Sequence, residues 1–305
     1  MKKNLKKPRG KDLAFVCVNS FLLVLVFIVT IYPLLFVISA SISDPSAVSS
    51  GKMVLFPVSP SLEAYRFILG YQAIWTGYAN TIFYTFFGTL INLLLTIPCA
   101  YALSRRDCPL KGLIMTLFMI TMYFSGGLIP GYLNIVSMGL LNTRLVMLIF
   151  GAVSTYNLIV ARTFFASTIP WELHEAAFLD GCSDFRMLLK IVLPLSSPII
   201  VVLILYYGVG HWNSYFNAMI YLQDRAKYPL QVFLREILTL GKFADTALAT
   251  GDYSPEDMAA LLKQADQANM IKYAVIIVST APMLAVYPWL QKYFAKGVMI
   301  GSVKG

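Results

Sequence analysis

The side chains most suited to catalysis are few in this chain of 305 residues. It holds two histidines and four cysteines, and neither His174 nor His211 has a cysteine or carboxylate arranged around it for a triad or a metal site. No G-x-x-x-x-G-K-[ST] loop is present to hold nucleotide phosphates. The sequence therefore predicts no enzyme, no metal site and no cofactor site in this chain. Any energy for work would come from a partner or an ion gradient.

A second group of candidate residues lies between Tyr206 and Leu222, a stretch unusually rich in aromatic and amide side chains. Amides can satisfy hydroxyl groups, and aromatic faces can stack on the C–H faces of sugar rings, so the stretch could line a path for a sugar. An aromatic belt at a membrane interface, with hydrogen bonds between helices, is the alternative. The residues predicted to line the path are Tyr206, Tyr207, His211, Trp212, Asn213 and Asn217.

The third candidate is a charged stretch from Trp171 to Pro198 in an otherwise apolar chain. Each charge costs roughly 2.5 to 3.5 kcal/mol at the middle of a bilayer, so its first half is expected to lie outside the hydrocarbon. Pro170 suits the first position of a helix, and Gly181 can take the left-handed conformation that ends one. Ser183 can cap a second helix, which Pro194 and Pro198 would bend where it enters the membrane.

An amphipathic helix lying on lipid headgroups would show the same charge pattern. The spacing is more specific, because it resembles the EAA signature of ABC importer permeases. The matching residues are Glu175, Ala176, Ala177, Asp180, Gly181, Ile191, Leu193 and Pro194. The resemblance implies a coupling helix at about 170–182 that sits in a surface cleft of an ATPase subunit. His174 would be a solvated residue on that helix.

Composition points to a helical protein that crosses a membrane several times. Hydrophobic residues make up 58% of the chain and charged residues 13%, and the mean hydropathy is +0.70, which is typical of such proteins. The net charge of +9 is spread over short loops and termini, so it indicates topology and not a nucleic-acid partner. No disulfide framework is expected from Cys17, Cys99, Cys108 and Cys182.

Six apolar runs predict six membrane spans in one domain over residues 13–295. The approximate spans are 13–40, 80–103, 113–136, 145–165, 188–222 and 271–290, with the third broken or kinked near Gly126 and Gly127. Basic clusters place both termini in the cytoplasm and the loops at 41–75 and 223–270 outside. The basic N-terminus, 1–12, could begin a signal peptide, but the apolar run after it is too long for one.

The chain is also similar to the second permease of carbohydrate importers of the maltose type. The similarity lies in W-N-x-Y-F-N at Trp212 to Asn217 and in the ending of the 296–305 tail. It implies an all-α, polytopic, six-helix type I importer fold in a bacterial plasma membrane. Permeases for complex oligosaccharides, such as polygalacturonan or rhamnogalacturonan fragments, look nearest. The tail residues implied to reach into the ATPase dimer are Gly301, Ser302, Val303, Lys304 and Gly305.

The implied machine pairs this chain with a homologous permease, two ATP-binding subunits that hold ATP and Mg²⁺, and an extracytoplasmic solute-binding protein. An ion-coupled secondary transporter is the alternative, but the predicted spans hold almost no ionisable residue apart from His211. A membrane scaffold or sensor without flux is a further alternative. The sequence does not name the sugar or show whether this subunit touches it.

Overall fold

The computed structural model describes residues 11–239, 256, 260 and 268–288. The described residues form helices and turns, with no β-strand. The chain divides into two compact units. The first unit is Met1–Gly70 with Ile237–Val278, and the second is Tyr71–Glu236 with Ser279–Gly305.

The first unit begins with α1 (Lys11–Ser41), an apolar helix. Nearly all side chains along its first two thirds are exposed, which suits a helix surrounded by lipid or by other helices. Asp44 caps the short α2 (Pro45–Ser49) by accepting hydrogen bonds from the backbone of Ser46 and Ala47. The predicted loop at 41–75 also contains a short helix, α3 (Glu63–Gly70). Its Tyr65 hydroxyl donates a hydrogen bond to Ser41 Oγ over 2.8 Å.

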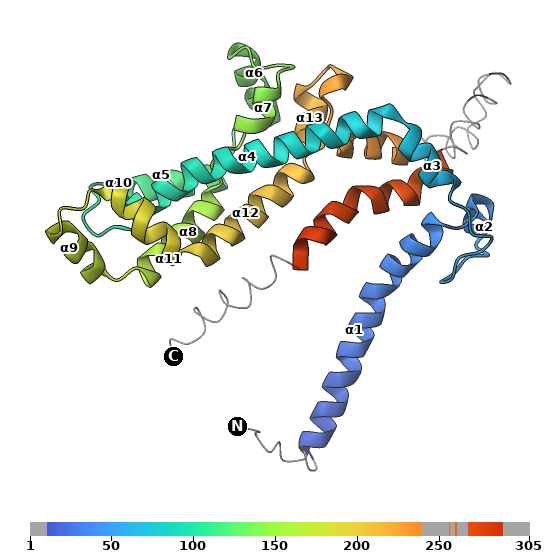
Figure 1. Cartoon of the computed structure of the whole chain (residues 1–305), viewed down its shortest axis with the longest axis horizontal. Coiled ribbons are helices and arrows are strands. Elements are labelled where there is room, and N and C mark those ends of the chain that lie inside the picture. The colour runs from blue at the N-terminus through green and yellow to red at the C-terminus, as the bar shows by residue number, and fades with distance from the viewer. Residues whose placement is uncertain (1–10, 240–255, 257–259, 261–267, 289–305) are drawn as a thin grey trace. The chain divides into compact units, whose positions relative to one another are not determined.

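The second unit is built on α4 (Gln72–Ser104), a helix of 33 residues. Packed along it are α12 (Ser197–Trp212), α8 (Thr155–Thr168) and α7 (Arg144–Ile149). Figure 1 shows α4, α8 and α12 running together, with α9 (Trp171–Leu179) beyond one end of them. The core between them buries Ala100, Leu158, Ala161, Val192 and Leu203.

The opposite end of α4 holds the segment that follows α13 (Phe216–Tyr221) and includes η2 (Arg225–Lys227). The Asn80 amide donates to the backbone carbonyls of Ala226 and Tyr228 over 2.8 and 3.0 Å. Thr81 Oγ1 accepts from the backbone N–H of Leu230. These bonds satisfy backbone groups at η2 and at the start of the helix that begins at Leu230, where a continuous α-helix does not supply partners.

Three predicted spans are interrupted. The third is α5 (Lys111–Tyr123) followed by α6 (Leu128–Ser137), bent by 114° at the predicted glycine pair. The fourth was expected to be continuous but breaks between α7 and α8, where Gly151 has a φ of +72° and Ser154 caps α8. The fifth bends by 86° before α12, where Pro194 and Pro198 predicted a bend, and it also breaks before α13, which was not predicted.

Among the described residues, three helices are long and apolar enough to cross a membrane: α1, α4 and the helix Ala268–Pro288. The number is five if each bent pair counts as one span. The predicted fourth span is not among them, because α8 has only 14 residues and a straight crossing needs about 20.

Candidate functional site

The helix α9 ends in the way that its sequence predicts. Gly181 has a φ of +71° and donates its N–H to the Phe178 carbonyl, while the N–H of Cys182 reaches the Ala177 carbonyl over 2.9 Å. This pair of bonds is a Schellman motif, which satisfies the last carbonyls of a helix and turns the chain sharply. At the other end Pro170 occupies the N-cap and Trp171 begins the helix, one residue later than expected.

The two sides of α9 differ in burial. Ala177 is 6% exposed and joins the core of the second unit, where its small side chain allows close packing. Phe178 and Leu179 are 81% and 86% exposed, and Phe185 after the turn is 70% exposed. Four other residues of the EAA pattern are exposed: Glu175, Ala176, Asp180 and Gly181. An exposed apolar patch rimmed by carboxylates is typical of a protein-binding surface.

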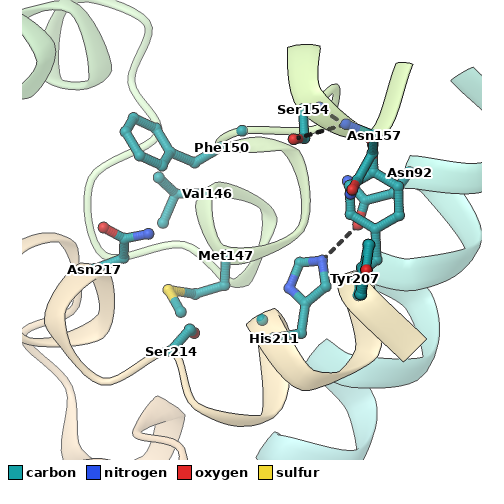
Figure 2. A pocket seen from close by; sticks show the side chains of 13 residues that line it. Asn92, Val146, Met147, Phe150, Ser154, Asn157, Tyr207, His211, Ser214 and Asn217 are labelled. Atoms are coloured by element: carbon teal, nitrogen blue, oxygen red, sulfur yellow. Dashed lines mark hydrogen bonds between the residues drawn. The ribbon is translucent and has the colours of Figure 1, made fainter. Parts of the chain in front are cut away.

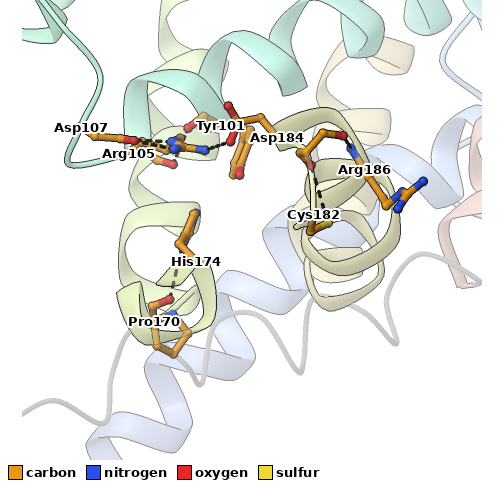
Figure 3. A network of polar contacts seen from close by, with 10 residues as sticks. Tyr101, Arg105, Asp107, Pro170, His174, Cys182, Asp184 and Arg186 are labelled. Carbon is orange, nitrogen blue, oxygen red and sulfur yellow. Dashed lines mark hydrogen bonds and ion pairs between the residues drawn. The ribbon is translucent and has the colours of Figure 1, made fainter. Parts of the chain in front are cut away.

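His174 is not the solvated residue that was expected. Its ring stacks between Trp171, at 5.2 Å between ring centroids, and Tyr101 of α4, at 5.9 Å. Its Nδ1 lies 3.4 Å from the Pro170 carbonyl oxygen, and its Nε2 is buried. Figure 3 shows His174 on the side of α9 that faces Tyr101. The stack therefore joins α9 to the end of α4.

A charged network makes a second connection at the same end of α4. Arg105 follows the last residue of α4 and pairs with Asp107 in the next turn and with Asp184, the first residue of α10 (Asp184–Met187). In Figure 3 the guanidinium lies between the two carboxylates. Its hydrogen bonds hold the pKa of Asp107 below the ordinary value, and the hydrogen bond to Asp107 is the main cause that raises the pKa of Arg105. Arg105 thus ties α4 to the helix after α9.

The route from α9 to α12 bends as the prolines predict. Ser183 caps α10 by accepting from the N–H of Arg186. A π-helical turn, η1 (Leu188–Val192), and the short α11 (Leu193–Leu195) follow. Pro194 and Pro198 donate no backbone hydrogen bond, so the ladder is interrupted around Ser196, where the 86° bend lies.

A cavity of about 280 Å³ lies among α4, the segment between α7 and α8, and α12 (Figure 2). It contains four of the six residues predicted to line a sugar path: Tyr206, Tyr207, His211 and Asn217. Trp212 and Asn213 are not in its lining. Trp212 is 6% exposed and donates its indole N–H to the Ser279 carbonyl over 3.1 Å, and the Asn213 amide donates to the Val209 carbonyl.

His211 is held in one orientation by Asn92 of α4. The Asn92 amide N–H donates to the Ala152 carbonyl over 2.7 Å, which leaves its oxygen facing His211 Nε2 at 2.7 Å. Because a carbonyl oxygen only accepts, His211 Nε2 must be the donor. Figure 2 shows the other ring nitrogen on the side of Met147, which lines the cavity.

Tyr207 fixes the segment between α7 and α8. Its hydroxyl shares a 2.7 Å hydrogen bond with Thr96 Oγ1 and accepts from the N–H of Ser154 over 3.1 Å. Asn92, Ser154 and Asn157 also line the cavity, and they were not among the residues predicted to do so. Amide side chains inside apolar runs were the available signal for Asn92 and Asn157.

Two predicted sites remain without a structural description. The tail residues Gly301 to Gly305 lie outside the described residues, as does most of the 223–270 loop beyond residue 239. Within the described part of the chain, no three His, Cys, Asp or Glu side chains converge as a metal ion would require.

Comparison with known proteins places this geometry in a family. Residues 71–300 match the model of the binding-protein-dependent transport system inner membrane component. The polygalacturonan/rhamnogalacturonan transport system permease protein YtcP of Bacillus subtilis is 40% identical over 94% of this chain and 97% of its own length. Protein LplC of the same organism is 38% identical over 91% of this chain and 90% of its own length.

A solved structure has the same fold. The crystal structure of a bacterial ABC transporter involved in the import of the acidic polysaccharide alginate matches with a TM-score of 0.82 and 35% identity, over 95% of this chain and 100% of the matched chain. The family match covers α4 to α13, including α9 and the cavity residues. The chain belongs to the family of binding-protein-dependent transport system inner membrane components, the permease subunits of ABC importers.

Proposed function

We propose that this chain forms half of the translocation pore of an ATP-driven importer of a carbohydrate, in which α9 couples the pore to a separate ATPase. The relatives support the substrate class, since one is named for polygalacturonan and rhamnogalacturonan transport and the matched structure for alginate import. An oligosaccharide derived from a polysaccharide of this kind is therefore the best candidate.

The two-sided burial of α9 carries the coupling proposal. Ala177 and His174 attach the helix to the permease, while Phe178 and Leu179 are exposed with nothing of the described chain covering them. A helix held on one side and apolar on the other is suited to an ATPase cleft. The residues proposed to act in coupling are Glu175, Ala176, Ala177, Asp180, Gly181 and Pro194.

The mechanism follows from these attachments. ATP and Mg²⁺ are bound by two partner subunits, and this chain hydrolyses no ATP itself. Closure of the ATPase dimer would displace α9, and the displacement would reach α12 through Pro194 and α4 through the His174 stack and the Arg105–Asp184 pair. The pore would then change from a state that is open to the outside into a state that is open to the cytoplasm. Two states of this kind are what alternating access requires.

The remaining parts of the machine follow from the family. We propose a homologous second permease, and an extracytoplasmic binding protein that docks on the loops at 41–75 and 223–270. Both termini would be cytoplasmic, with Gly301 to Gly305 reaching the ATPase dimer. Tyr206, Tyr207, His211 and Asn217 would line the substrate path, with Trp212 and Asn213 beside it.

Purification of the tagged chain from solubilised native membranes tests this proposal. We expect an ATPase, a second polytopic permease and a solute-binding protein to copurify. A chain that comes out alone or as a homodimer, without a nucleotide-binding partner, would refute the proposal and favour ion-coupled transport.

A further inference from the structure

The cavity between α4 and α12 has open hydrogen-bonding groups in a fixed arrangement. We propose that it is a subsite for one sugar ring, recognised through its hydroxyl groups by Asn157, His211 and Asn217. This inference rests on the proposed function and goes further: this subunit would contact the substrate directly, and it would recognise the hydroxyl groups of the sugar.

Three side chains offer unused polar atoms to the cavity. Asn157 is 6% exposed, yet its amide makes no hydrogen bond to any other described residue. His211 uses only Nε2, toward Asn92, and the amide of Asn217 has no partner among the described residues. None of these atoms is closed off from solvent. Polar groups of a binding site that lack protein partners are suited to ligand hydroxyls, because a buried polar group needs a partner.

The arrangement is preorganised by residues that do not themselves need to touch the sugar. Asn92 fixes the His211 tautomer, which leaves Nδ1 of the neutral ring as an acceptor for a hydroxyl proton. Gly88 makes room for the imidazole, since a Cβ there would lie 2.4 Å from His211 Cε1. Tyr207 holds the backbone at Ser154, three residues before Asn157. A site fixed in this way loses little entropy on binding.

The charge and the volume of the cavity also restrict which part of a ligand it can bind. Its thirteen residues include no aspartate, glutamate, lysine or arginine. A sugar carboxylate placed here would lose water without gaining a cation, which is unfavourable. The volume of about 280 Å³ lies just below the range of ligand pockets, about 300 to 1,000 Å³, and suits one ring of a longer chain. Tyr206 and Phe150 add aromatic surface for the C–H face of that ring. An acidic oligosaccharide would therefore be held here by its hydroxyls, with its carboxylates bound elsewhere.

Uptake by native cells tests the subsite. Cells with and without the chain are given a partial hydrolysate of pectin and alginate that contains neutral and acidic oligosaccharides, and mass spectrometry follows which oligosaccharides leave the medium. Asn157→Leu removes the amide without breaking a hydrogen bond within the described chain, so it should fold normally. His211→Phe is the second variant. Asn134→Leu is the matched control, since Asn134 is exposed on α6 and is not in the cavity lining.

We expect both cavity variants to lower uptake about fivefold or more, by a similar factor for neutral and acidic oligosaccharides, with unchanged copurification of the partners. Asn134→Leu should take up oligosaccharides at the normal rate. Normal uptake by both cavity variants, or a loss confined to acidic oligosaccharides, would overturn the subsite. If deletion of the chain changes the uptake of no oligosaccharide, the proposed carbohydrate import itself fails.

Discussion

The ring of His174 on α9 lies nearly parallel to the ring of Tyr101 on α4, with 5.9 Å between centroids and 13° between planes. Aromatic pairs of this kind contribute about 0.5 to 1.5 kcal/mol beyond the area they bury. The pair shows that α9 is attached to the long helix of its unit as well as to the bent segment that follows it. In the proposed coupling, movement of α9 would therefore reach the pore by two routes, through α4 and through the bent segment.

The first prediction concerns this stack. His174→Ala should leave the chain inserted and assembled but should raise the number of ATP molecules hydrolysed per oligosaccharide imported, because α4 no longer follows α9. The measurement compares ATPase activity and uptake in proteoliposomes. His174→Phe keeps an aromatic ring between Trp171 and Tyr101 and should restore most of the coupling. Equal ratios for the wild type and His174→Ala would show that the stack does not transmit movement.

The second prediction concerns the turn after α9. Gly181→Asp places a side chain at a φ of +71°, which costs roughly 1 to 2 kcal/mol, and adds a charge to the proposed ATPase-binding surface. Glu175→Lys also changes the charge of this surface, but it introduces no backbone strain. Both variants should insert but hydrolyse ATP without import.

A matched glycine separates strain from coupling in that experiment. Gly139 also has a positive φ, +68°, at the end of α6, and the space that a Cβ would occupy there has no other atom within 4 Å. Gly139→Asp introduces the same residue and a similar strain far along the chain from α9. It should import at close to the normal rate, and a defect equal to that of Gly181→Asp would mean that strain alone explains the result.

The third prediction concerns pH and the Arg105 network. Asp107 has a lowered pKa because Arg105 hydrogen-bonds its carboxylate, so this stabilisation is present above the unfolded pKa, about 4, and is lost as the pH falls through the folded pKa. The decrease in melting temperature caused by Arg105→Gln should therefore have its full size at about pH 6 and should be smaller below about pH 4. The loss should be small, since the side chains of Asp107 and Asp184 are 50% and 77% exposed.

Thermal unfolding in detergent at several pH values provides that measurement. Arg106→Gln is the control, because Arg106 forms no ion pair with any described residue and lies over the Trp171 ring instead. Its effect should not vary over this pH range. A constant difference between the wild type and Arg105→Gln from pH 6 to pH 3 would contradict the assignment of the stabilisation to the carboxylates.

The fourth prediction uses the close contact at Gly88. Gly88→Ala should push the His211 ring away, since the new Cβ would otherwise lie 2.4 Å from it. We expect normal insertion, a broken bond to Asn92 and an uptake defect like that of His211→Phe. Gly112→Ala on α5 has open space around its Cβ and should have no effect. Normal uptake by Gly88→Ala would show that the position of His211 is not important for transport.

Local signals in the sequence predicted the α9 region well. Gly181 ends the helix, Ser183 caps the next one, and the two prolines bend the entry to α12, because each of these effects depends on neighbouring residues. The family and the fold class could be predicted because the EAA spacing is a local pattern. Both predictions are confirmed by the family match and by the solved structure.

Features that depend on distant residues were missed. Asn92 and His211 are 119 positions apart, and only the packing of α4 on α12 brings them together. The break at 150–154 was not predicted, because the residues on both sides of it are apolar enough to be interpreted as one span. Tyr207 and Asn92 supply the hydrogen bonds that permit a non-helical segment there. His174 was expected in solvent because its aromatic neighbour Tyr101 lies on another helix.

The central claim, that α9 sits on an ATPase subunit, is tested most directly by cross-linking from Leu179. A photoreactive residue at this position, 86% exposed, should cross-link to an ATPase subunit in native membranes. The same residue at Ile129 on α6, 72% exposed, should not. A cross-link from Leu179 to lipid alone, or equal ATPase cross-linking from both positions, would contradict the claim.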